Sequence, residues 1–327
     1  NMTAVTARAP GKINVFLHVG DRMEDGYHEL VTVFQALDMY EEVTLRPCFD
    51  QPDTVVRNMS GNDTYPGLSP VHAVTLKGRF GSTAIPLDHS NLAVSAINRL
   101  AAQTGVHVPV EVEIEKNVPV AGGMGGGSAD AAAALVAYAK LAGINDPDLL
   151  RTVGAELGAD VPFALRGGFA VGTGRGDELS PILSSGEFTW VLATSVDELS
   201  TPVVYHALDD LRDSGKAPHA GDVQTQLADV LQAVGSGDAH ALAQVVHNDM
   251  EPAAFGLLPA IAEVVDTGRQ AGALAALMSG SGPTVGFLVE GATHALDLTV
   301  LLEASESVKH VVRATGPACG AHIVTPG

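Results

Sequence analysis

The chain has 327 residues, 46% of them hydrophobic, which is enough for a substantial core and, at this length, for about two domains. Its 38 acidic residues against 18 lysines and arginines give a net charge of −20 that repels polyanions, so we expect no nucleic-acid partner. The sequence has neither the roughly 18–20 consecutive apolar residues of a membrane span nor the layout of a signal peptide, which predicts a cytoplasmic protein with no membrane partner.

Hydrophobic periodicity predicts the elements of the first half. Alternation and β-branched residues indicate strands, whereas longer periodic runs that open at Ser or Asn and end at Gly indicate helices. In chain order we expect two strands within 3–20 separated by a turn at Pro10-Gly11, a loop at 21–30, strands within 31–47, a helix at 90–104, a strand within 108–120, and helices at 128–142 and 147–157.

The second half is expected to begin near Gly167-Gly168, so we predict two domains, residues 1–168 and 169–327. A strand and a polar turn follow this point. Further on, helical patterns occur at 202–214, 222–235, 238–247 and 256–271, and strand patterns at 188–195, 284–290 and 310–316. Because strands and helices alternate without a regular βαβ repeat, the pattern predicts an α+β fold in two lobes.

The segment 119–135, PVAGGMGGGSADAAAAL, places five glycines within 122–127 at the start of a predicted helix. Glycine lets backbone N–H groups approach a ligand closely, and a helix N-terminus offers unpaired N–H donors and a positive dipole end. This pattern favours a phosphate site over a flexible loop whose glycines serve tight packing. The Walker pattern is absent, and Ser128 stands where the last glycine of GxGxxG would fall.

Three motifs in order resemble those of the GHMP kinases, a family that includes galactokinase, homoserine kinase and mevalonate kinase. APGKIN at 9–14 resembles the first motif, PVAGGMGGGSA at 119–129 the second, and MSGSGPTVGFL at 278–288 the third. The resemblance implies an N-terminal nucleotide-binding lobe, a C-terminal ferredoxin-like lobe, and an active site between them. It also implies that ATP is a substrate whose triphosphate is wrapped by Pro119, Ala121, Gly122, Gly123, Met124, Gly125, Gly126, Gly127 and Ser128.

The resemblance also implies a catalytic pair. Asp160 in LGADVPF at 157–163 matches the segment with the family's catalytic aspartate, although the residue alone reads better as a turn or helix-end residue. Lys12 would hold this carboxylate ionised and polarise the acceptor hydroxyl, whereas by itself it reads as a surface lysine. Whether Asp160 removes the proton or only orients the hydroxyl stays open, because phosphoryl-transfer transition states can need little base assistance.

Magnesium is expected to accompany ATP, and the hydroxyl of Ser128 is the expected protein ligand, with phosphate oxygens and water in the other positions. A helix N-cap role is compatible with the same serine. Asp130 could reach the metal, but a carboxylate in the first helical turn commonly complements the dipole, so it is not assigned to the metal site.

The loop DGYHEL at 25–30 resembles the branch of the family whose acceptor is a cytidine-diphosphate-linked polyol phosphate. For this substrate the resemblance implies binding by Tyr27 and His28 at the pyrimidine, although such a pair commonly packs or is solvated on a surface loop. The third motif is expected to close over phosphates or acceptor, with a tight hairpin as the alternative. The expected acceptor-binding residues are Asn14, Tyr27, His28, Ser279, Gly280, Ser281 and Gly282.

Two other functions stay open. One is a GHMP kinase for another small alcohol, such as mevalonate or a sugar, against which the DGYHEL loop argues. The other is a non-catalytic nucleotide-binding regulator on the same fold, against which the presence of both Lys12 and Asp160 argues. We expect small-molecule substrates only, and a monomer or a weak homodimer.

Overall fold

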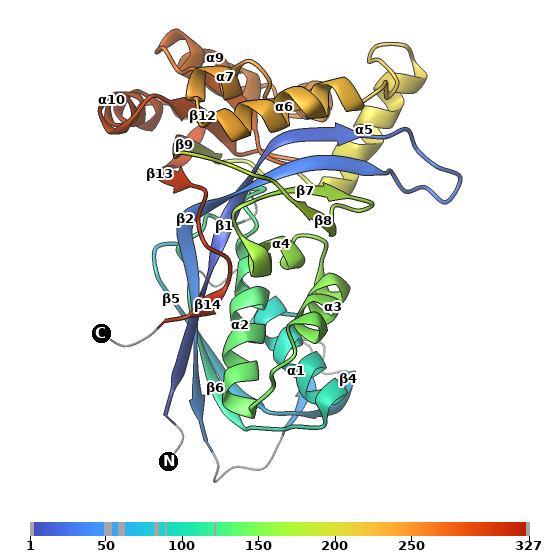
Figure 1. The fold of residues 1–327 in the computed structure, drawn as a ribbon, viewed down its shortest axis with the longest axis vertical. Coiled ribbons are helices and arrows are strands. Elements are labelled where there is room, and N and C mark those ends of the chain that lie inside the picture. The colour runs from blue at the N-terminus through green and yellow to red at the C-terminus, as the bar shows by residue number, and fades with distance from the viewer. Residues whose placement is uncertain are drawn as a thin grey trace.

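The computed structural model describes residues 3–48, 54–57, 63–81, 85–88, 90–120 and 122–324, with the backbone alone at 54–57 and 63–68. Two lobes lie one above the other in Figure 1, and the long strands β1 (Val5–Val19) and β2 (Leu30–Pro47) run from the lower lobe up to the upper one. These two strands pair antiparallel over most of their length. The first predicted motif, at 9–14, therefore lies on a strand that extends through both lobes.

The lower lobe is built on the sheet that contains β1 and β2. Its order is β10-β1-β2-β6-β5, with β14 pairing to β1, β7 to β2, and β8 to β7. The added strands are β5 (Val71–Lys77), β6 (Val110–Glu115), β7 (Phe169–Thr173), β8 (Glu178–Pro181), β10 (His247–Asn248) and β14 (His322–Ile323), while β3 (Thr54–Arg57) and β4 (Asp63–Ser69) form a separate pair. The sheet continues past residue 168, so the division of domains there stays a prediction.

Four helices cover one face of this sheet: α1 (Leu92–Thr104), α2 (Gly126–Ala142), α3 (Pro147–Leu157) and α4 (Val161–Arg166). The alanine-rich α2 is buried along most of its length, because small side chains let it pack closely against α1 and the sheet. Its first turn lies at the end of the predicted phosphate loop. The packing of α2 thus fixes where that loop meets the rest of the lobe.

The upper lobe has a four-stranded antiparallel sheet in the order β11-β12-β9-β13. Its strands are β9 (Phe188–Ser195), β11 (Ala275–Met278), β12 (Val285–Val289) and β13 (Val308–Gly316), and its helices are α5 (Thr201–Asp213), α6 (Gln224–Ser236), α7 (Ala239–Ala243), α8 (Glu251–Leu257), α9 (Ala260–Gln270) and α10 (Ala292–Glu303). Numbered by chain position the strand order is 4-1-3-2, with helical segments between the first and second and between the third and fourth strands. This topology confirms the predicted ferredoxin-like lobe and the α+β class.

The two lobes share a core. Trp190 of β9 is fully buried, and its ring N–H donates to Gln35 Oε1 of β2 at 2.8 Å. Gly286 of β12 packs so closely on Ile13 of β1 that a Cβ there would lie 2.6 Å from the Ile13 side chain. The upper sheet therefore sits directly on the strands that carry the first motif.

Several sequence expectations were wrong in detail. The turn at Pro10-Gly11 does not form, since β1 runs through these residues with a register shift between them. The helix expected at 238–247 ends at Ala243, and β10 follows. The helix expected at 256–271 is two helices, because Pro259 lacks an N–H donor and stands at the N-cap of α9 after α8 has ended.

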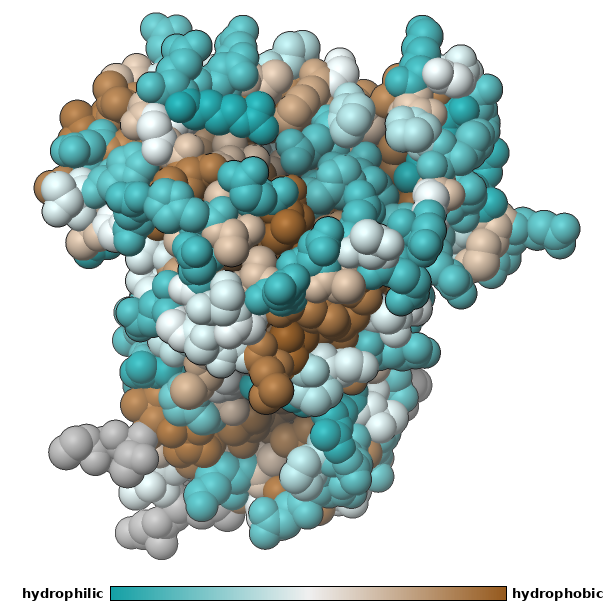
Figure 2. All heavy atoms as spheres, turned by 45° about the horizontal axis from the view of Figure 1, so that its top comes forward, coloured by the Kyte–Doolittle hydropathy of each residue, from teal (hydrophilic) through white to brown (hydrophobic). Residues whose placement is uncertain are grey.

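Hydrophilic side chains cover much of the upper lobe in Figure 2, and hydrophobic ones gather lower on the same face. Within the part of the chain that the structure describes, no helix is both long and apolar enough to cross a membrane.

Candidate active site

The predicted catalytic pair lies where β1 meets the start of α4. Lys12 is 6% exposed, and its Nζ lies 3.9 Å from Asp160 Oδ2. Asp160 occupies the N-cap position of α4 but its side chain makes no capping hydrogen bond, so the carboxylate is directed to other contacts. Burial lowers the pKa of Lys12, because the charged amine loses water, and the charge of Asp160 partly opposes this effect. The structure thus brings together the two residues that the sequence paired.

Asn14 is held beside this pair by a chain of hydrogen bonds. Lys12 Nζ donates to Asn14 Oδ1 at 2.5 Å, Asn14 Nδ2 donates to Thr32 Oγ1 at 2.9 Å, and Thr32 Oγ1 donates to the carbonyl of Phe16 at 2.8 Å. The chain fixes which end of the Asn14 amide faces the lysine. Asn14 therefore orients the ammonium group and lies within reach of anything that Lys12 contacts.

The backbone conformation and close packing of the glycine loop explain its high glycine content. Gly123 and Gly125 have φ of +86° and +73°, and Gly125 stands at the N-cap of α2. A Cβ at Gly122 would lie 2.1 Å from Thr284 Oγ1, and one at Gly123 would lie 2.3 Å from the carbonyl oxygen of Ser279. Two of the glycines are thus required by tight packing against the third motif. Packing therefore accounts for these two glycines, and phosphate binding by the loop stays a prediction.

A hollow of about 620 Å³ lies along this loop. Most of the predicted ATP-binding residues line it, namely Pro119, Gly122, Gly123, Met124, Gly125, Gly126, Gly127 and Ser128, whereas Ala121 lies outside the described residues. The side chain of Met124 is buried in the core, and its carbonyl accepts the Lys12 N–H at 2.9 Å. Gly126 is buried against Val118, so a Cβ there would point into the lobe.

Because Gly125 is the N-cap of α2, Ser128 is not, and its hydroxyl is not used for capping. Among the described residues no group of three or more His, Cys, Asp or Glu side chains could hold a metal ion. The Asp130 carboxylate is bound by Lys116 at 2.5 Å. Ser128 lines the hollow, and its role as a metal ligand stays a prediction.

The third motif lies over Lys12 of the predicted catalytic pair. A Cβ at Gly280 would lie 3.6 Å from Lys12 Nζ, and Ser279 Oγ donates to the carbonyl of Gly123 at 2.9 Å. Gly282 N–H donates to the Ser279 carbonyl at 2.9 Å, which closes a tight turn. The hairpin alternative and the closing role are therefore compatible. Ser281 Oγ lies 2.8 Å from Thr201 Oγ1, at the start of α5.

Asn248 of β10 holds this loop from behind, and sequence reasoning missed it. Its Nδ2 donates to the carbonyls of Met278 at 2.9 Å and of Gly280 at 2.7 Å, while its Oδ1 accepts the Met250 N–H at 2.8 Å. The residue is 2% exposed. One asparagine thus uses both donors and its acceptor to fix the main chain above Lys12.

A second hollow of about 370 Å³ contains the catalytic pair. Its lining includes Lys12, Asn14, Thr32, Asp160, Tyr205, Gly280, Ser281 and Gly282. Gly123 and Thr201 line this hollow and the one along the glycine loop. The two hollows therefore adjoin each other at Gly123 and Thr201.

Tyr205 of α5, also missed from the sequence, connects this cleft to the predicted pyrimidine residues. Its ring lies 4.9 Å from that of His28, and its pKa is raised to about 12 by burial and by the charge of Asp160. His28 is nearly buried and its Nε2 lies 2.7 Å from Asp209 Oδ1, so it is not the solvated residue of the alternative reading. Tyr27 is 59% exposed. Neither residue of this loop lines the cleft; Tyr205 stands between them and Asp160.

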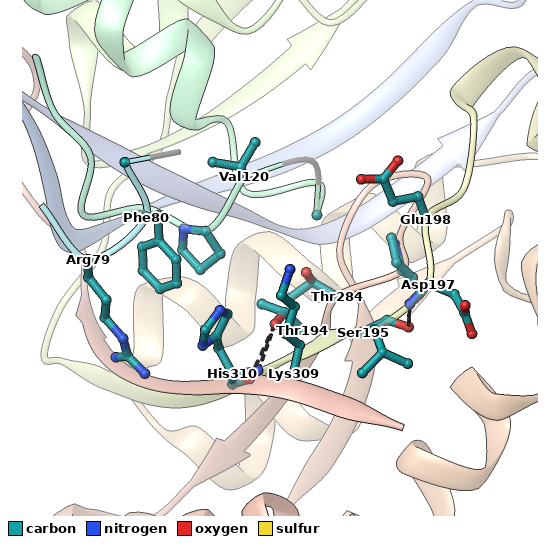
Figure 3. A pocket seen from close by; sticks show the side chains of 15 residues that line it. Arg79, Phe80, Val120, Thr194, Ser195, Asp197, Glu198, Thr284, Lys309 and His310 are labelled. Carbon is teal, nitrogen blue, oxygen red and sulfur yellow. Dashed lines mark hydrogen bonds between the residues drawn. The ribbon is translucent and has the colours of Figure 1, made fainter. Parts of the chain in front are cut away.

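A third, smaller hollow of about 190 Å³ lies on the other side of the glycine loop (Figure 3). Arg79, Phe80 and His310 lie together on one side of it, and Asp197 and Glu198 on the other. Pro119 and Gly122 line this hollow and the one along the loop. These two residues of the loop therefore separate the two spaces.

Comparison with known proteins agrees with this geometry. Residues 91–168 match the model of the GHMP kinases N-terminal domain, and residues 230–299 match that of the GHMP kinases C-terminal domain. The chain is 47% identical to the 4-diphosphocytidyl-2-C-methyl-D-erythritol kinase of Leifsonia xyli subsp. xyli, over 99% of this chain and 100% of the relative. It is 45% identical to the protein of that name from Mycobacterium tuberculosis, over 98% of this chain and 93% of the relative.

Solved structures have the same fold. A crystal structure of 4-(cytidine 5'-diphospho)-2C-methyl-D-erythritol kinase superposes with a TM-score of 0.71 at 29% identity, covering 95% of this chain and 98% of the other. Mevalonate kinase from L. major in complex with R-mevalonate superposes with a TM-score of 0.72 at 17% identity, covering 96% of each chain. At that identity the second match shows a shared fold alone.

Proposed function

Because the chain belongs to the 4-diphosphocytidyl-2-C-methyl-D-erythritol kinase family of the GHMP kinases, we propose that it phosphorylates the 2-hydroxyl of 4-diphosphocytidyl-2-C-methyl-D-erythritol with ATP, in the non-mevalonate route to isoprenoid precursors. The observation that carries the proposal is the pairing of Lys12 with Asp160, 3.9 Å apart, where the acceptor cleft meets the glycine loop. Phosphoryl transfer needs an acceptor hydroxyl, a base or orienting group, and positive charge at one place.

In this proposal Asp160 accepts the hydrogen bond of the acceptor hydroxyl and directs its oxygen toward the γ-phosphoryl group. Lys12 lies beside that carboxylate and stabilises the negative charge of the transferring group. Asn14 holds the ammonium in place. The main-chain N–H groups at the start of α2 hold the phosphates of ATP, which favour a helix N-terminus.

We propose that Mg²⁺ accompanies ATP, held by phosphate oxygens, water and Ser128. When bound, the ion neutralises charge on the phosphates, for which the loop offers hydrogen-bond donors but few fixed cations. Lys12 is the cation shared with the acceptor side. The role of Ser128 is supported by its place in the first turn of α2, on the hollow along the loop.

For the acceptor, we assign the polyol end to Asn14 and to the loop Ser279, Gly280, Ser281 and Gly282, and the cytidine end to Tyr27 and His28. The exposed ring of Tyr27 offers a stacking face, and the contact of His28 with Tyr205 connects the loop to the cleft. A base edge that pairs with buried groups allows strong discrimination, since a substrate without it leaves those groups unpaired.

The test is ADP release with 4-diphosphocytidyl-2-C-methyl-D-erythritol, free 2-C-methyl-D-erythritol 4-phosphate and mevalonate as acceptors, each with ATP and Mg²⁺. We expect the cytidyl compound to be preferred by up to about 10⁴-fold in kcat/KM, with a new phosphomonoester in its phosphorus NMR spectrum. Equal use of mevalonate would instead support a kinase for another alcohol. No transfer to any acceptor, with ATP bound, would support a nucleotide-binding regulator.

The same proposal keeps two further expectations. A protein that acts on soluble nucleotides fits the predicted cytoplasmic location. The expected monomer or weak homodimer stays a prediction.

A further inference from the structure

A buried charged cluster lies at the base of the glycine loop, apart from the catalytic pair. Lys116 Nζ lies 2.5 Å from Asp130 Oδ2 and 3.0 Å from Glu41 Oε2. All three side chains are at most 5% exposed. Burying charged groups is costly unless they are paired, so such a cluster needs a reason. We call these three residues the loop-base cluster.

The loop-base cluster joins the two ends of the glycine loop. Lys116 directly follows β6, before the loop, and Asp130 lies in α2, after it. Glu41 of β2 also accepts the N–H groups of Asn117 at 3.0 Å and Val118 at 2.6 Å through Oε1. Entry and exit of the loop are thus fastened to each other and to the central strand.

The backbone of Lys116 is fixed as well. Its N–H donates to the Lys77 carbonyl at 2.8 Å, and its carbonyl accepts the Phe80 N–H at 2.9 Å. The cluster is therefore anchored on β5 and the residues after it, and a change in the cluster acts on the loop between Lys116 and Asp130, which it joins at both ends.

The cluster also has a balanced charge. The pKa of Glu41 is raised to about 9, because burial removes water from the carboxyl and because the charge and hydrogen bond of Asp130 favour a proton, while Lys116 opposes the shift. With one proton shared by the two carboxyl groups, one ammonium faces one negative charge. Since Lys116 and Asp130 line the hollow assigned to ATP, this balance avoids a net negative charge beside the phosphates.

We propose that Glu41, Lys116 and Asp130 are positioning residues for the nucleotide, and that their contacts hold both ends of the glycine loop in the conformation that receives the triphosphate. This inference rests on the ATP site of the proposed function. It differs from a purely structural role in one respect. Loss of the cluster should weaken the affinity for ATP far more than the affinity for the acceptor.

The test compares two substitutions of similar size at one position. Asp130→Asn keeps an oxygen for Lys116 and gives an amide that can donate to Glu41 Oε2, so ATP affinity should stay within about threefold of the parent. Asp130→Leu removes the contact and should raise the Kd for MgATP by about 10- to 100-fold, because a displacement near 1 Å can cost a productive geometry this much. Binding is measured by calorimetry without acceptor, so the outcome does not depend on which alcohol is phosphorylated.

Steady-state kinetics supply the second readout. In Asp130→Leu the KM for ATP should rise in proportion to the Kd, while the KM for the acceptor changes less than threefold. Lys116→Met should give the same pattern, and Lys140→Met, at the exposed far end of α2, is the matched control and should bind ATP as the parent does. Circular dichroism confirms that each variant is folded.

Three results would overturn the inference: a folded Asp130→Leu protein with parental ATP affinity, an Asp130→Asn protein as impaired as Asp130→Leu, or equal rises in both KM values. If Asp130→Leu does not fold, Lys116→Met is judged by the same criteria. The inference is also wrong if the ATP affinity of the variants changes only in proportion to their thermal stability.

Discussion

Asn248→Asp is expected to damage the protein more than Asn248→Ala, although aspartate has the shape of asparagine. The amide of Asn248 donates to the carbonyls of Met278 and Gly280. A carboxylate at the same place faces two carbonyl oxygens and repels both. Alanine leaves both carbonyls without this donor and the Met250 N–H without its acceptor, but it introduces no charge.

The size of the effect follows from these contacts. A buried polar group left without a partner costs ~1–3 kcal/mol, so the two carbonyls alone give a loss of about 2–6 kcal/mol of unfolding free energy for Asn248→Ala. An unpaired buried charge costs more, so the aspartate variant should lose further stability at neutral pH. The introduced carboxyl is buried beside two carbonyl oxygens, which raises its pKa in the folded protein above that in the unfolded chain. The folded state therefore binds a proton at a pH where the unfolded chain does not. Stability therefore returns as the pH falls and is lost as the pH rises.

Urea unfolding of both variants and of the parent at pH 5 and pH 8 measures this ranking, and kcat/KM for the acceptor measures the position of the loop over Lys12. We expect the aspartate variant to be the least stable at pH 8 and to recover relative to alanine at pH 5. An aspartate variant as stable as the parent at pH 8 would refute the reasoning, because the two carbonyls would then not depend on the amide donors.

Three further predictions concern the reaction. Asp160→Asn keeps shape and loses charge, so kcat should fall by about 10²–10⁴-fold with ATP binding retained; more than half of parental turnover, with chemistry rate-limiting, would contradict its role. Burial lowers the pKa of Lys12, so kcat should be lost with rising pH at a pH below the pKa of an ordinary lysine. If kcat is lost only at or above the pKa of an ordinary lysine, the buried amine is not the group that controls the rate. Tyr27→Ala should lower kcat/KM for the acceptor by about 5- to 150-fold, equivalent to ~1–3 kcal/mol of stacking. The KM for ATP and the stability to urea should stay nearly unaltered, because the ring is 59% exposed. Unchanged acceptor kinetics would show that Tyr27 is not part of the cytidine site.

Local signals predicted most of the elements. Asn91 caps α1 by accepting two backbone N–H groups, and Gly105 ends it with φ of +69°, which agrees with the helix expected at 90–104. Gly143 ends α2 in the same way. The start of α2 was expected two residues late, because the glycines read as loop although their backbone is already helical. Caps and periodicity act within a few residues, and so sequence alone carries them.

Contacts between distant residues were not predictable in this way. Pro10 and Gly11 signal a turn, but pairing with β2 on both sides of them keeps the strand intact and turns the signal into a register shift. Tyr205 and Asn248 lie in or beside segments that read as ordinary helix. Their roles depend on His28 and on the loop after β11, and no local pattern in the sequence marks such a contact.

The three motifs share one network of main-chain contacts, which explains why their order predicts a site although long segments separate them. Lys12 N–H donates to the Met124 carbonyl and so joins the first motif to the second, and Ser279 Oγ donates to the Gly123 carbonyl and joins the third to the second. Asn248 fixes the third motif to the strand next to β1. Because each motif contacts another, substitutions in two motifs can remove the same contact. Their effects on the free energy of unfolding should therefore not be additive.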